Sequence, residues 1–265
     1  MDMLISVIIP AYNESKRLNL NLPKIHEFFL KLDLGNKGKE LILVNDGSTD
    51  DTLAILDEFQ RNANEDNVEI KIISYEKNRG KGYAIKQGVK QARGQYIFFS
   101  DIDLSTPLSF FHVLFSEINE NYPIVIGSRN IDGSKIIIRQ PLFRRKIAKN
   151  FYRLIQLCFS FYIKDANCGF KLFSTRHGKA IFDLLESDRW AFDFEFLYLS
   201  QKYGFKIIEV PVESAFDTES RVRLFSDSAY TIFELIKIKC RELTGIYPDR
   251  LTLVDEDIIL KRKMF

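Results

Sequence analysis

Two aspartates, Asp101 and Asp103, follow a hydrophobic run directly in the segment YIFFSDIDLSTP, residues 96–107. The run has the composition of a buried strand, and a buried strand gains nothing from unpaired carboxylates, which cost several kcal/mol each when dry and uncompensated. Side chains two residues apart in an extended chain point the same way. If the chain is still extended here, both carboxylates face one spot, and the pattern predicts a positive group in that spot.

Two interpretations of this DxD pair stay open from the pattern alone. The aspartates can simply begin a loop, with Asp103 capping the helix that follows Pro107. Alternatively they hold a metal ion. The sequence has neither a P-loop nor a glycine-rich dinucleotide fingerprint after its first strand, which removes the common nucleotide-binding motifs. Carboxylates at a strand end suit a hard octahedral cation such as Mg²⁺ or Mn²⁺, whose remaining ligands include substrate phosphates.

The first half of the chain alternates between expected strands and helices. Hydrophobic runs at 4–10, 40–48, 68–76 and 123–129 predict strands, and apolar residues spaced by three and four between Leu18 and Leu32 predict a helix. This alternation predicts an α/β fold with a doubly wound, mostly parallel sheet and helices on both faces. Polar clusters (AYNES, NDGSTDD, DID and GSR) each follow a strand. Because ligands bind such sheets at the carboxyl ends of the strands, the clusters predict one shared site.

The pattern changes after Arg129. A long basic and aromatic helix is expected over 139–162, followed by a short strand at 168–174, two helices, a strand at 206–213 and a last helix at about 227–243. There is no repeat or low-complexity linker. We therefore expect one α/β domain over residues 1–225 and a C-terminal helical extension over 226–265.

Composition excludes several classes of protein. The chain has 265 residues, 46% of them hydrophobic and 28% charged, with a formal net charge of +2. This is ordinary globular composition, and the charge is too small for a dedicated nucleic-acid binder. Three widely spaced cysteines without a CxxC pair argue against a zinc site. The sequence contains no signal peptide and no run of ~18 apolar residues. We expect a cytoplasmic protein.

The motifs carry a specific resemblance. Four segments occur in the order and spacing of family 2 glycosyltransferases with the GT-A fold: SVIIPAYNE, LVNDGSTDDT, NRGKGYAIKQGVKQARGQYIFFSDIDLSTP and IGSR. The second half resembles the dolichyl-phosphate β-glucosyltransferase branch, through DANCGFKLFS, RWAFDFEFLYLSQKYGFKIIEVPV and CRELTGIY. The resemblance implies an inverting transferase that uses Mg²⁺ or Mn²⁺. It also implies a nucleotide-sugar donor, with UDP-glucose favoured over GDP-mannose, and a polyprenyl or dolichyl phosphate acceptor.

The resemblance also implies roles for individual residues. The nucleotide-sugar site comprises Pro10, Tyr12, Glu14, Asp46, Lys81, Asp101 and Asp103. Asp103 is the expected main metal ligand and Asp101 the second. The acceptor phosphate is assigned to Arg129, Ser220 and Arg221, with Arg223 as a spare candidate. Asp101, Asp103, Arg129 and Arg221 are thus the expected catalytic residues. Two positions depart from the family pattern: Asn45 replaces a usual aspartate, and Arg221 replaces a lysine.

Two further hypotheses concern the acceptor. A phosphate monoester is largely dianionic at neutral pH, because its second pKa is about 6, so it needs no general base, whereas a hydroxyl acceptor does. The segment 139–162 either lies on a membrane surface, giving peripheral attachment at the cytoplasmic face, or is a packed helix with a solvated basic face. Two rival functions stay open: transfer to a saccharide hydroxyl in cell-surface polysaccharide synthesis, or a non-catalytic nucleotide-sugar-binding module.

Overall fold

A computed structural model of the chain describes residues 3–35, 37–63, 68–138, 153, 155–156, 159–215, 224–251 and 253. Its strands are β1 Met3–Ala11, β2 Gly38–Asp46, β3 Val68–Tyr75, β4 Tyr96–Ser100, β5 Ile124–Ser128, β6 Lys135–Ile138, β7 Phe170–Ser174, β8 Ile207–Pro211 and β9 Glu213–Ala215. Its helices are α1 Ser15–Lys31, α2 Thr52–Ala63, α3 Lys81–Gln91, the 3₁₀ turn η1 Leu108–Phe110, α4 Phe111–Glu117, α6 Thr175–Leu184, α7 Phe192–Lys202 and α8 Leu224–Leu243.

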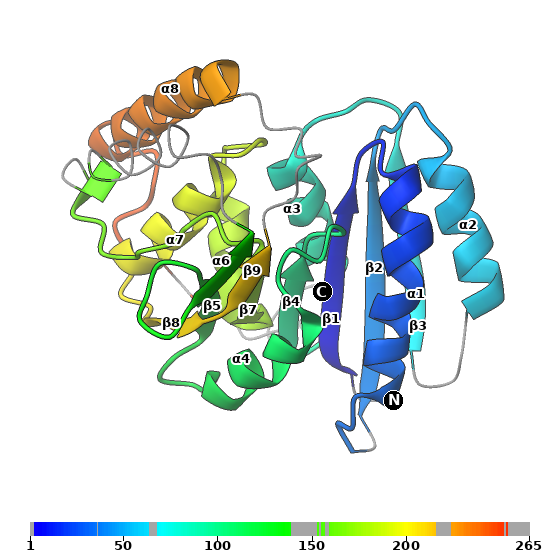
Figure 1. The fold of residues 1–265 in the computed structure, drawn as a ribbon. Helices are drawn as coiled ribbons and strands as arrows, with labels where there is room; N and C mark the ends of the chain where they lie inside the picture. Colours follow the sequence, from blue (N-terminus) through cyan, green and yellow to red (C-terminus); the bar gives the residue numbers. More distant parts are fainter. Residues whose placement is uncertain are drawn as a thin grey trace, which may run out of the picture.

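Seven strands form one sheet in the order β3-β2-β1-β4-β7-β5-β8 (Figure 1). All neighbours pair in parallel except β7, which is antiparallel to both β4 and β5. The chain order reverses at β1, which lies between β2 and β4. This is the position at which doubly wound sheets bind ligands. The predicted mostly parallel sheet is therefore confirmed.

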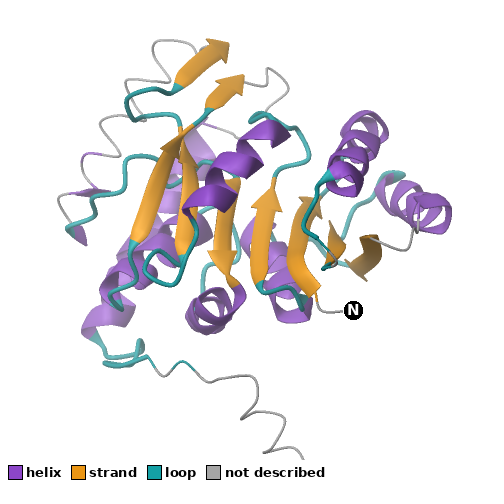
Figure 2. Cartoon of the chain, turned by 90° about the horizontal axis from the view of Figure 1, so that it is seen from below, coloured by secondary structure: helices purple, strands orange, loops and turns teal. Residues whose placement is uncertain are grey.

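Helices cover both faces of the sheet, as the view along it shows (Figure 2). Alternate side chains of a strand point to opposite faces, and two apolar clusters follow from this. Ile5, Val7 and Ile9 of β1 pack with α1, α2 and α4 on one face. Ile8, from the same strand, packs with α3, α6, α7 and α8 on the other. The sheet thus has two cores, and α3 and α7 share one of them.

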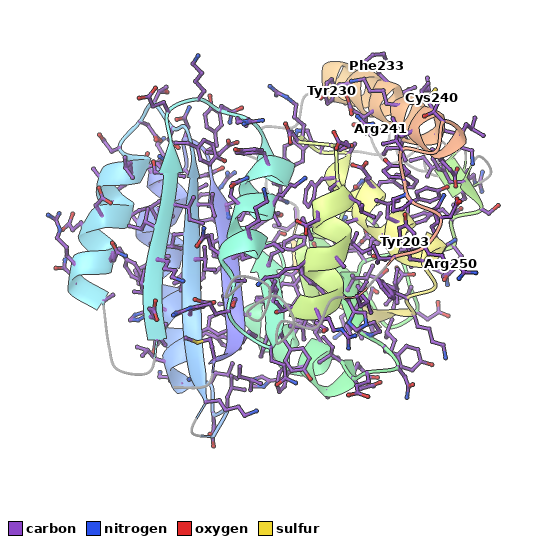
Figure 3. All side chains as sticks on the ribbon, turned by 180° about the vertical axis from the view of Figure 1, so that it is seen from behind. Tyr203, Tyr230, Phe233, Cys240, Arg241 and Arg250 are labelled. Atoms are coloured by element: carbon purple, nitrogen blue, oxygen red, sulfur yellow. The ribbon has the colours of Figure 1, made fainter. Side chains whose placement is uncertain are left out.

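The helix α8 packs on the side of α7 through its inner face. Leu235 and Ile238 are buried in the same cluster as α7, while Phe233 and Cys240 on the outer side are exposed (Figure 3). The division of the chain at residue 225 stays a prediction. Within the residues described, no helix combines the length and the apolar character that crossing a membrane requires. Most of the segment 139–162, with its expected membrane-surface role, lies outside those residues.

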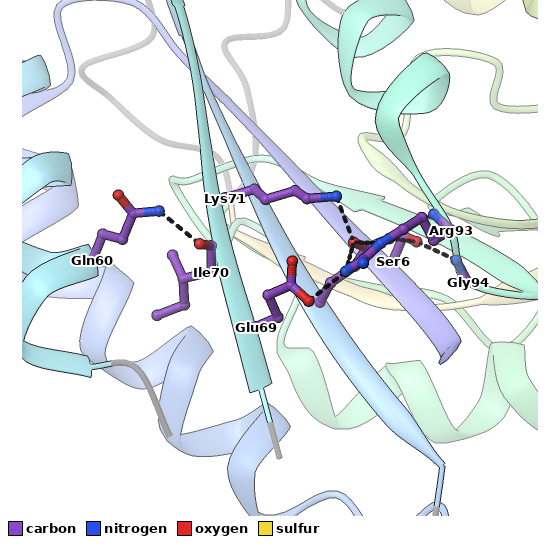
Figure 4. A network of polar contacts seen from close by, with 8 residues as sticks. Ser6, Gln60, Glu69, Ile70, Lys71, Arg93 and Gly94 are labelled. Carbon is purple, nitrogen blue, oxygen red and sulfur yellow. Dashed lines mark hydrogen bonds and ion pairs between the residues drawn. The ribbon is translucent and has the colours of Figure 1, made fainter. Parts of the chain in front are cut away.

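A buried carboxylate holds the amino ends of the central strands together. Glu40 of β2 is fully buried and accepts hydrogen bonds from the Ser6 hydroxyl at 2.5 Å and the Arg93 backbone amide at 2.6 Å. The Arg93 side chain and Lys71 lie 3.1 and 3.4 Å from the same carboxylate. Ser6 in turn accepts a hydrogen bond from the Gly94 amide at 2.8 Å (Figure 4). The cluster therefore joins β1, β2, β3 and the segment that leads into β4.

Replacing Glu40 by Gln is expected to lower the free energy of unfolding by about 2 kcal/mol, because donors that face a carboxylate lose their charged acceptor. Burial opposes the charge of Glu40, but hydrogen bonds from Ser6 and Arg93 and the charges of Lys71 and Arg93 hold its pKa below its ordinary value of 4.5. A lowered folded-state pKa gives stabilisation that is present above pH 4.5 and is lost as the pH falls. Urea unfolding measures the free energy of unfolding of both proteins. The difference between the two values should become smaller as the pH falls below 4.5.

The matched control is Glu69→Gln. Glu69 pairs with the same Arg93 but is 47% exposed, and an exposed pair contributes less than about 1 kcal/mol. If Glu40→Gln lowers the free energy of unfolding no more than Glu69→Gln does, the Glu40 carboxylate does not hold the strands together.

Candidate active site

The two aspartates of the DxD pair lie in a tight turn at the carboxyl end of β4. The strand ends at Ser100, and the Leu104 amide donates a hydrogen bond to the Asp101 carbonyl at 3.3 Å. Leu104 has a positive φ of 50°, which the turn requires. The condition of an extended chain at Asp101–Asp103 is therefore not met: the chain bends directly after Ser100, where its pairing with β7 ends.

The carboxylates nevertheless face a common positive group. The Lys81 ammonium lies 2.6 Å from Asp101 Oδ1, and the Lys81 side chain is only 14% exposed. Burial opposes the charge of Lys81, but Asp101, together with Asp193 and Asp103, raises its pKa above the usual value. Burial and the neighbouring Asp101 raise the pKa of Asp103. The predicted positive partner of the DxD pair is thus present, and it comes from the protein itself.

Close backbone packing fixes the position of Lys81 at the start of α3. Gly80, just before the helix, has a φ of +111°, and a Cβ there would lie 2.5 Å from the carbonyl oxygen of Asp188. The Asp188 carbonyl accepts a hydrogen bond from the Tyr83 amide at 2.9 Å. A Cβ on Gly82 would lie 2.6 Å from Phe192 Cβ. The segment before α7 therefore packs against the first turn of α3, and glycine is required for this approach.

A second lysine lies beneath the DxD turn. Lys171 of β7 is fully buried, and its ammonium donates hydrogen bonds to Asp193 at 2.5 Å and to the Cys168 carbonyl at 2.6 Å. Burial raises the pKa of Asp193, although the charge of Lys171 opposes this. Two residues earlier, Gly169 lies so close to Asp101 that a Cβ would be 2.0 Å from its Oδ2. The antiparallel strand β7 thus supports the site from below.

Sequence reasoning missed the roles of Gly169 and Lys171, although both leave a signal. A glycine at the edge of a strand pattern indicates close approach of the backbone to another group. A lysine between phenylalanine and leucine in a buried strand needs an acidic partner. Asp193 and Glu195 are two positions apart on an expected helix and so lie on different faces, which argues from the sequence against an acid–base pair. The structure separates them: Asp193 pairs with Lys171, and Glu195 accepts hydrogen bonds from the Ser187 amide at 2.8 Å and from the Tyr247 hydroxyl.

The polar residues after β1 and β2 form one connected surface. The Asn13 amide donates to the Ser48 hydroxyl at 2.9 Å, and the Glu14 amide donates to Thr52 at 2.8 Å. In the other direction, the Thr49 amide donates to the Asn13 side chain at 2.7 Å. Among the expected nucleotide-sugar residues here, Pro10 is half-buried near the end of β1 and Tyr12 is 39% exposed. Glu14 forms an ion pair with Arg17 at 2.8 Å.

Asp46 has a positioning role that the sequence did not reveal. Its buried carboxylate accepts hydrogen bonds at 2.8 Å from the Asn78 side chain and from the backbone amides of Arg79 and Gly80. It therefore fixes the loop that leads into Lys81. The contact between Asp46 and a nucleotide stays a prediction.

Arg129, the expected acceptor-phosphate contact, is bound to a buried acid. Its Nε and Nη2 atoms donate to Asp165 at 2.7 and 2.8 Å, and its backbone amide donates to the same carboxylate at 2.9 Å. The charge of Asp165 raises the pKa of Arg129, and Arg129 lowers the pKa of Asp165 although burial opposes this. The Arg129 side chain as a whole is 31% exposed. Asp165 thus orients Arg129 and leaves part of it accessible. The other expected phosphate contacts, Ser220, Arg221 and the spare Arg223, lie outside the described residues.

The donor set fits a divalent cation whose shell is completed by a ligand. The described part of the chain contains no group of three or more metal-binding side chains. It contains two neighbouring carboxylates, Asp101 and Asp103, whose charges influence each other. One or two carboxylates with substrate phosphates are the usual protein environment of Mg²⁺. Asp103 and Asp101 are therefore suited to hold such an ion only together with an anionic ligand.

Comparison with known proteins places the chain among sugar transferases. The profile of the family described as "Glycosyl transferase family 2" matches residues 6–182. The chain is 33% identical over 258 residues to a dolichyl-phosphate beta-glucosyltransferase of Dictyostelium discoideum, covering 93% of this chain and 77% of the relative. It is 31% identical over 251 residues to the human protein of the same name, with coverages of 92% and 77%.

Solved structures share the fold at low identity. The glucosyl-3-phosphoglycerate synthase of Mycobacterium tuberculosis matches with a TM-score of 0.65 and 18% identity, covering 89% of this chain and 80% of that one. The mannosyl-3-phosphoglycerate synthase of Rubrobacter xylanophilus matches with a TM-score of 0.67 and 14% identity, with coverages of 97% and 80%. Both confirm the GT-A type of fold.

The variant Gly169→Ala should weaken Mn²⁺-dependent UDP binding by about tenfold or more while leaving the fold intact. The new methyl group meets the end of the Asp101 side chain, which is 30% exposed and can turn toward solvent. A displaced Asp101 can no longer face Lys81 or share a ligand with Asp103. Calorimetric titration measures the binding, and thermal unfolding confirms that the protein folds.

The control is the same change in an Asp101→Ala background. Without the carboxylate there is no clash, so the alanine at position 169 should have no further effect on binding. An equal loss in both backgrounds would show that Gly169 acts through another contact.

Proposed function

Because the chain belongs to glycosyltransferase family 2, we propose that it transfers glucose from UDP-glucose to a polyprenyl or dolichyl phosphate, with inversion at the sugar carbon. The donor and the acceptor are the proposal; that the protein is a glycosyltransferase follows from its family. Relatives that match more than nine-tenths of the chain are named dolichyl-phosphate beta-glucosyltransferases, which supports both choices.

The observation that carries the proposal is the arrangement of Lys81, Asp101 and Asp103 at the carboxyl edge of the sheet. The two carboxylates lie beside β1, where the chain order reverses, and the Lys81 ammonium lies 2.6 Å from Asp101. A nucleotide sugar has a diphosphate leaving group that gains negative charge as the glycosidic bond breaks. Fixed cations at that point stabilise the transition state more than the ground state.

We assign the following roles to the residues. Asp103 and Asp101 hold the divalent cation, which when bound stabilises the charge of the departing diphosphate. Lys81 donates to the diphosphate. Arg129, oriented by Asp165, faces the acceptor phosphate. A planar guanidinium held by one carboxylate keeps further N–H groups for a second oxyanion.

The surroundings of the site favour a phosphate acceptor over a hydroxyl. Asp165 and Asp193, which lie near the DxD turn, are each paired with a cation. The three histidines lie on helices elsewhere: His26 packs on Phe59, His112 on Phe28, and His177 contacts Ser174. Neither these two acids nor the histidines therefore supply a free general base next to the DxD pair. A dianionic phosphate attacks without one.

The choice of metal and nucleotide has support from a structural neighbour. A mycobacterial glucosyl-3-phosphoglycerate synthase with a TM-score of 0.56 to this chain was solved with Mn²⁺ and UDP. UDP is accordingly the first nucleotide to test, with Mn²⁺ or Mg²⁺ as the metal. Attachment to a membrane surface through the segment 139–162 is part of the same proposal, since the acceptor is a lipid.

Replacing Asp103 by Ala should abolish the effect of Mn²⁺ on UDP binding and lower the transfer rate by about 10²–10³, the effect of removing one main electrostatic contact from a transition state. The matched control is Asp57→Ala, which removes an exposed aspartate on α2 and should change neither quantity. Transfer by Asp103→Ala at the unaltered rate in EDTA would rule out the metal role of the DxD pair.

The acceptor is tested with UDP-glucose, Mn²⁺ and either a polyprenyl phosphate or the matching polyprenol. Only the phosphate should accept glucose. Its rate should fall below about pH 6, where the phosphate takes up its second proton. Because the proton binds to the substrate, variants of enzyme carboxylates should keep this fall. Comparable transfer to the alcohol would show that the enzyme carries a general base. Activity confined to a soluble saccharide would favour the alternative function, transfer to a saccharide hydroxyl.

A further inference from the structure

Lys81 is bound to Asp101, one of the two carboxylates that are suited to hold a metal ion. Its ammonium lies 2.6 Å from Asp101 Oδ1, in a largely buried position. Asp193 and Asp103 are also close enough to stabilise its charge. A divalent cation bound to Asp101 meets this ammonium across a short distance. Two like charges at such a separation repel each other, and more strongly in a largely buried site than in water.

The contacts of Lys81 allow it to move, whereas those of the second lysine do not. Lys171 is fixed by two hydrogen bonds, to Asp193 and to the Cys168 carbonyl, and is fully buried. Lys81 has one ion-pair partner at hydrogen-bond distance among the described residues. Its ammonium otherwise lies 5.7 Å from the ring centre of Trp190 and 6.0 Å from those of Phe99 and Phe192. Ring faces attract a cation without fixing its direction.

We propose that Lys81 and the divalent cation compete for Asp101, so that the nucleotide-free enzyme is neutralised by its own lysine and takes up metal together with the diphosphate. The inference rests on the proposed nucleotide-sugar site. The diphosphate makes the exchange favourable in two ways. It offers oxygens to the metal, which the two carboxylates alone cannot saturate, and it gives the Lys81 ammonium a new anionic partner.

The proposed exchange predicts a change in metal affinity that differs from the change expected if Lys81 only attracts the diphosphate or only holds Asp101. Removing the lysine charge should improve the binding of metal alone and impair the binding of nucleotide. A lysine that only contacts the diphosphate leaves metal binding in the nucleotide-free protein unchanged. A lysine that only holds Asp101 in place makes metal binding weaker when it is lost. The sign of the change in metal affinity therefore separates the three roles.

The test measures Mn²⁺ binding without nucleotide, by the electron paramagnetic resonance signal of free Mn²⁺, in the unaltered protein and in Lys81→Met. The variant should bind Mn²⁺ at least about tenfold more tightly, because one positive charge beside the site is lost. Its affinity for UDP in the presence of saturating Mn²⁺ should fall by a similar factor. Lys81→Gln, which is also neutral but keeps a polar end, should show the same two changes and guards against a folding defect in the first variant.

Lys90→Met is the matched control. Lys90 is exposed in the last turn of the same helix, so this variant has the same net charge, and its Mn²⁺ affinity should change less than about twofold. In an Asp101→Asn background, Lys81→Met should bring no gain, because the contested carboxylate is absent. An unchanged or weaker Mn²⁺ affinity in Lys81→Met overturns the proposal, as does a gain that persists without Asp101.

The result is independent of the transfer reaction. Neither sugar nor acceptor is present in the titration with Mn²⁺ alone, so failure to glucosylate polyprenyl phosphate leaves this outcome as it is. Conversely, an active enzyme whose Lys81→Met variant binds Mn²⁺ no better would retain the proposed function and lose the exchange.

Discussion

The ion pair between Asp101 and Lys81 is the contact around which the site is built. Asp101 directly follows β4, and Lys81 is the first residue of α3, which packs on β1 and β2. Both partners are held by backbone geometry. Asp101 lies against Gly169, where even a methyl group does not fit, and Lys81 follows Gly80 with a φ of +111°. Charges brought together in this way are costly to separate in a partly buried site, so a ligand that separates them must supply charges of its own.

The supports of this pair form a chain of contacts from loops far apart in the sequence. Asp46 fixes the loop before Lys81 from one side through three hydrogen bonds. Glu195 fixes Ser187 from the other side, and the neighbouring Asp188 carbonyl binds the first turn of α3. Each of these carboxylates satisfies backbone amides, which otherwise lack partners in a loop. Together these hydrogen bonds join the end of β2, the start of α3 and the segment before α7 at the carboxyl edge of the sheet.

Much of this architecture could be predicted from the sequence because it depends on local pattern. The strand runs, the helix spacing from Leu18 to Leu32 and the polar clusters at strand ends predict the sheet and the edge where Asp46, Lys81 and Asp101 meet. The antiparallel direction of β7 could not be predicted, because nothing in the run from Phe170 to Ser174 records its direction. The turn at Asp103 was missed for a similar reason: a left-handed Leu104 has no sequence signal. Pairings such as Lys171 with Asp193 and Arg129 with Asp165 join residues 22 and 36 positions apart, and only the fold brings them together.

The two ends of the central strands differ in their polar contacts. The amino ends carry the buried Glu40 cluster, and the carboxyl ends carry the charged groups of the candidate site. At the amino ends, Glu40 gathers Ser6, Lys71 and Arg93 and so fixes the start of β1 relative to the segment before β4. At the carboxyl ends of the same strands, Asp101 and Asp103 lie beside the Lys81 ammonium, in the position proposed for the ligand. Stability derived at one end allows groups at the other end to be arranged for binding rather than for mutual satisfaction. Because β1 and β4 are paired in parallel from Ile5 and Tyr96 to Ile8 and Phe99, the strand whose start is fixed by the Glu40 cluster is the one that leads directly into Asp101.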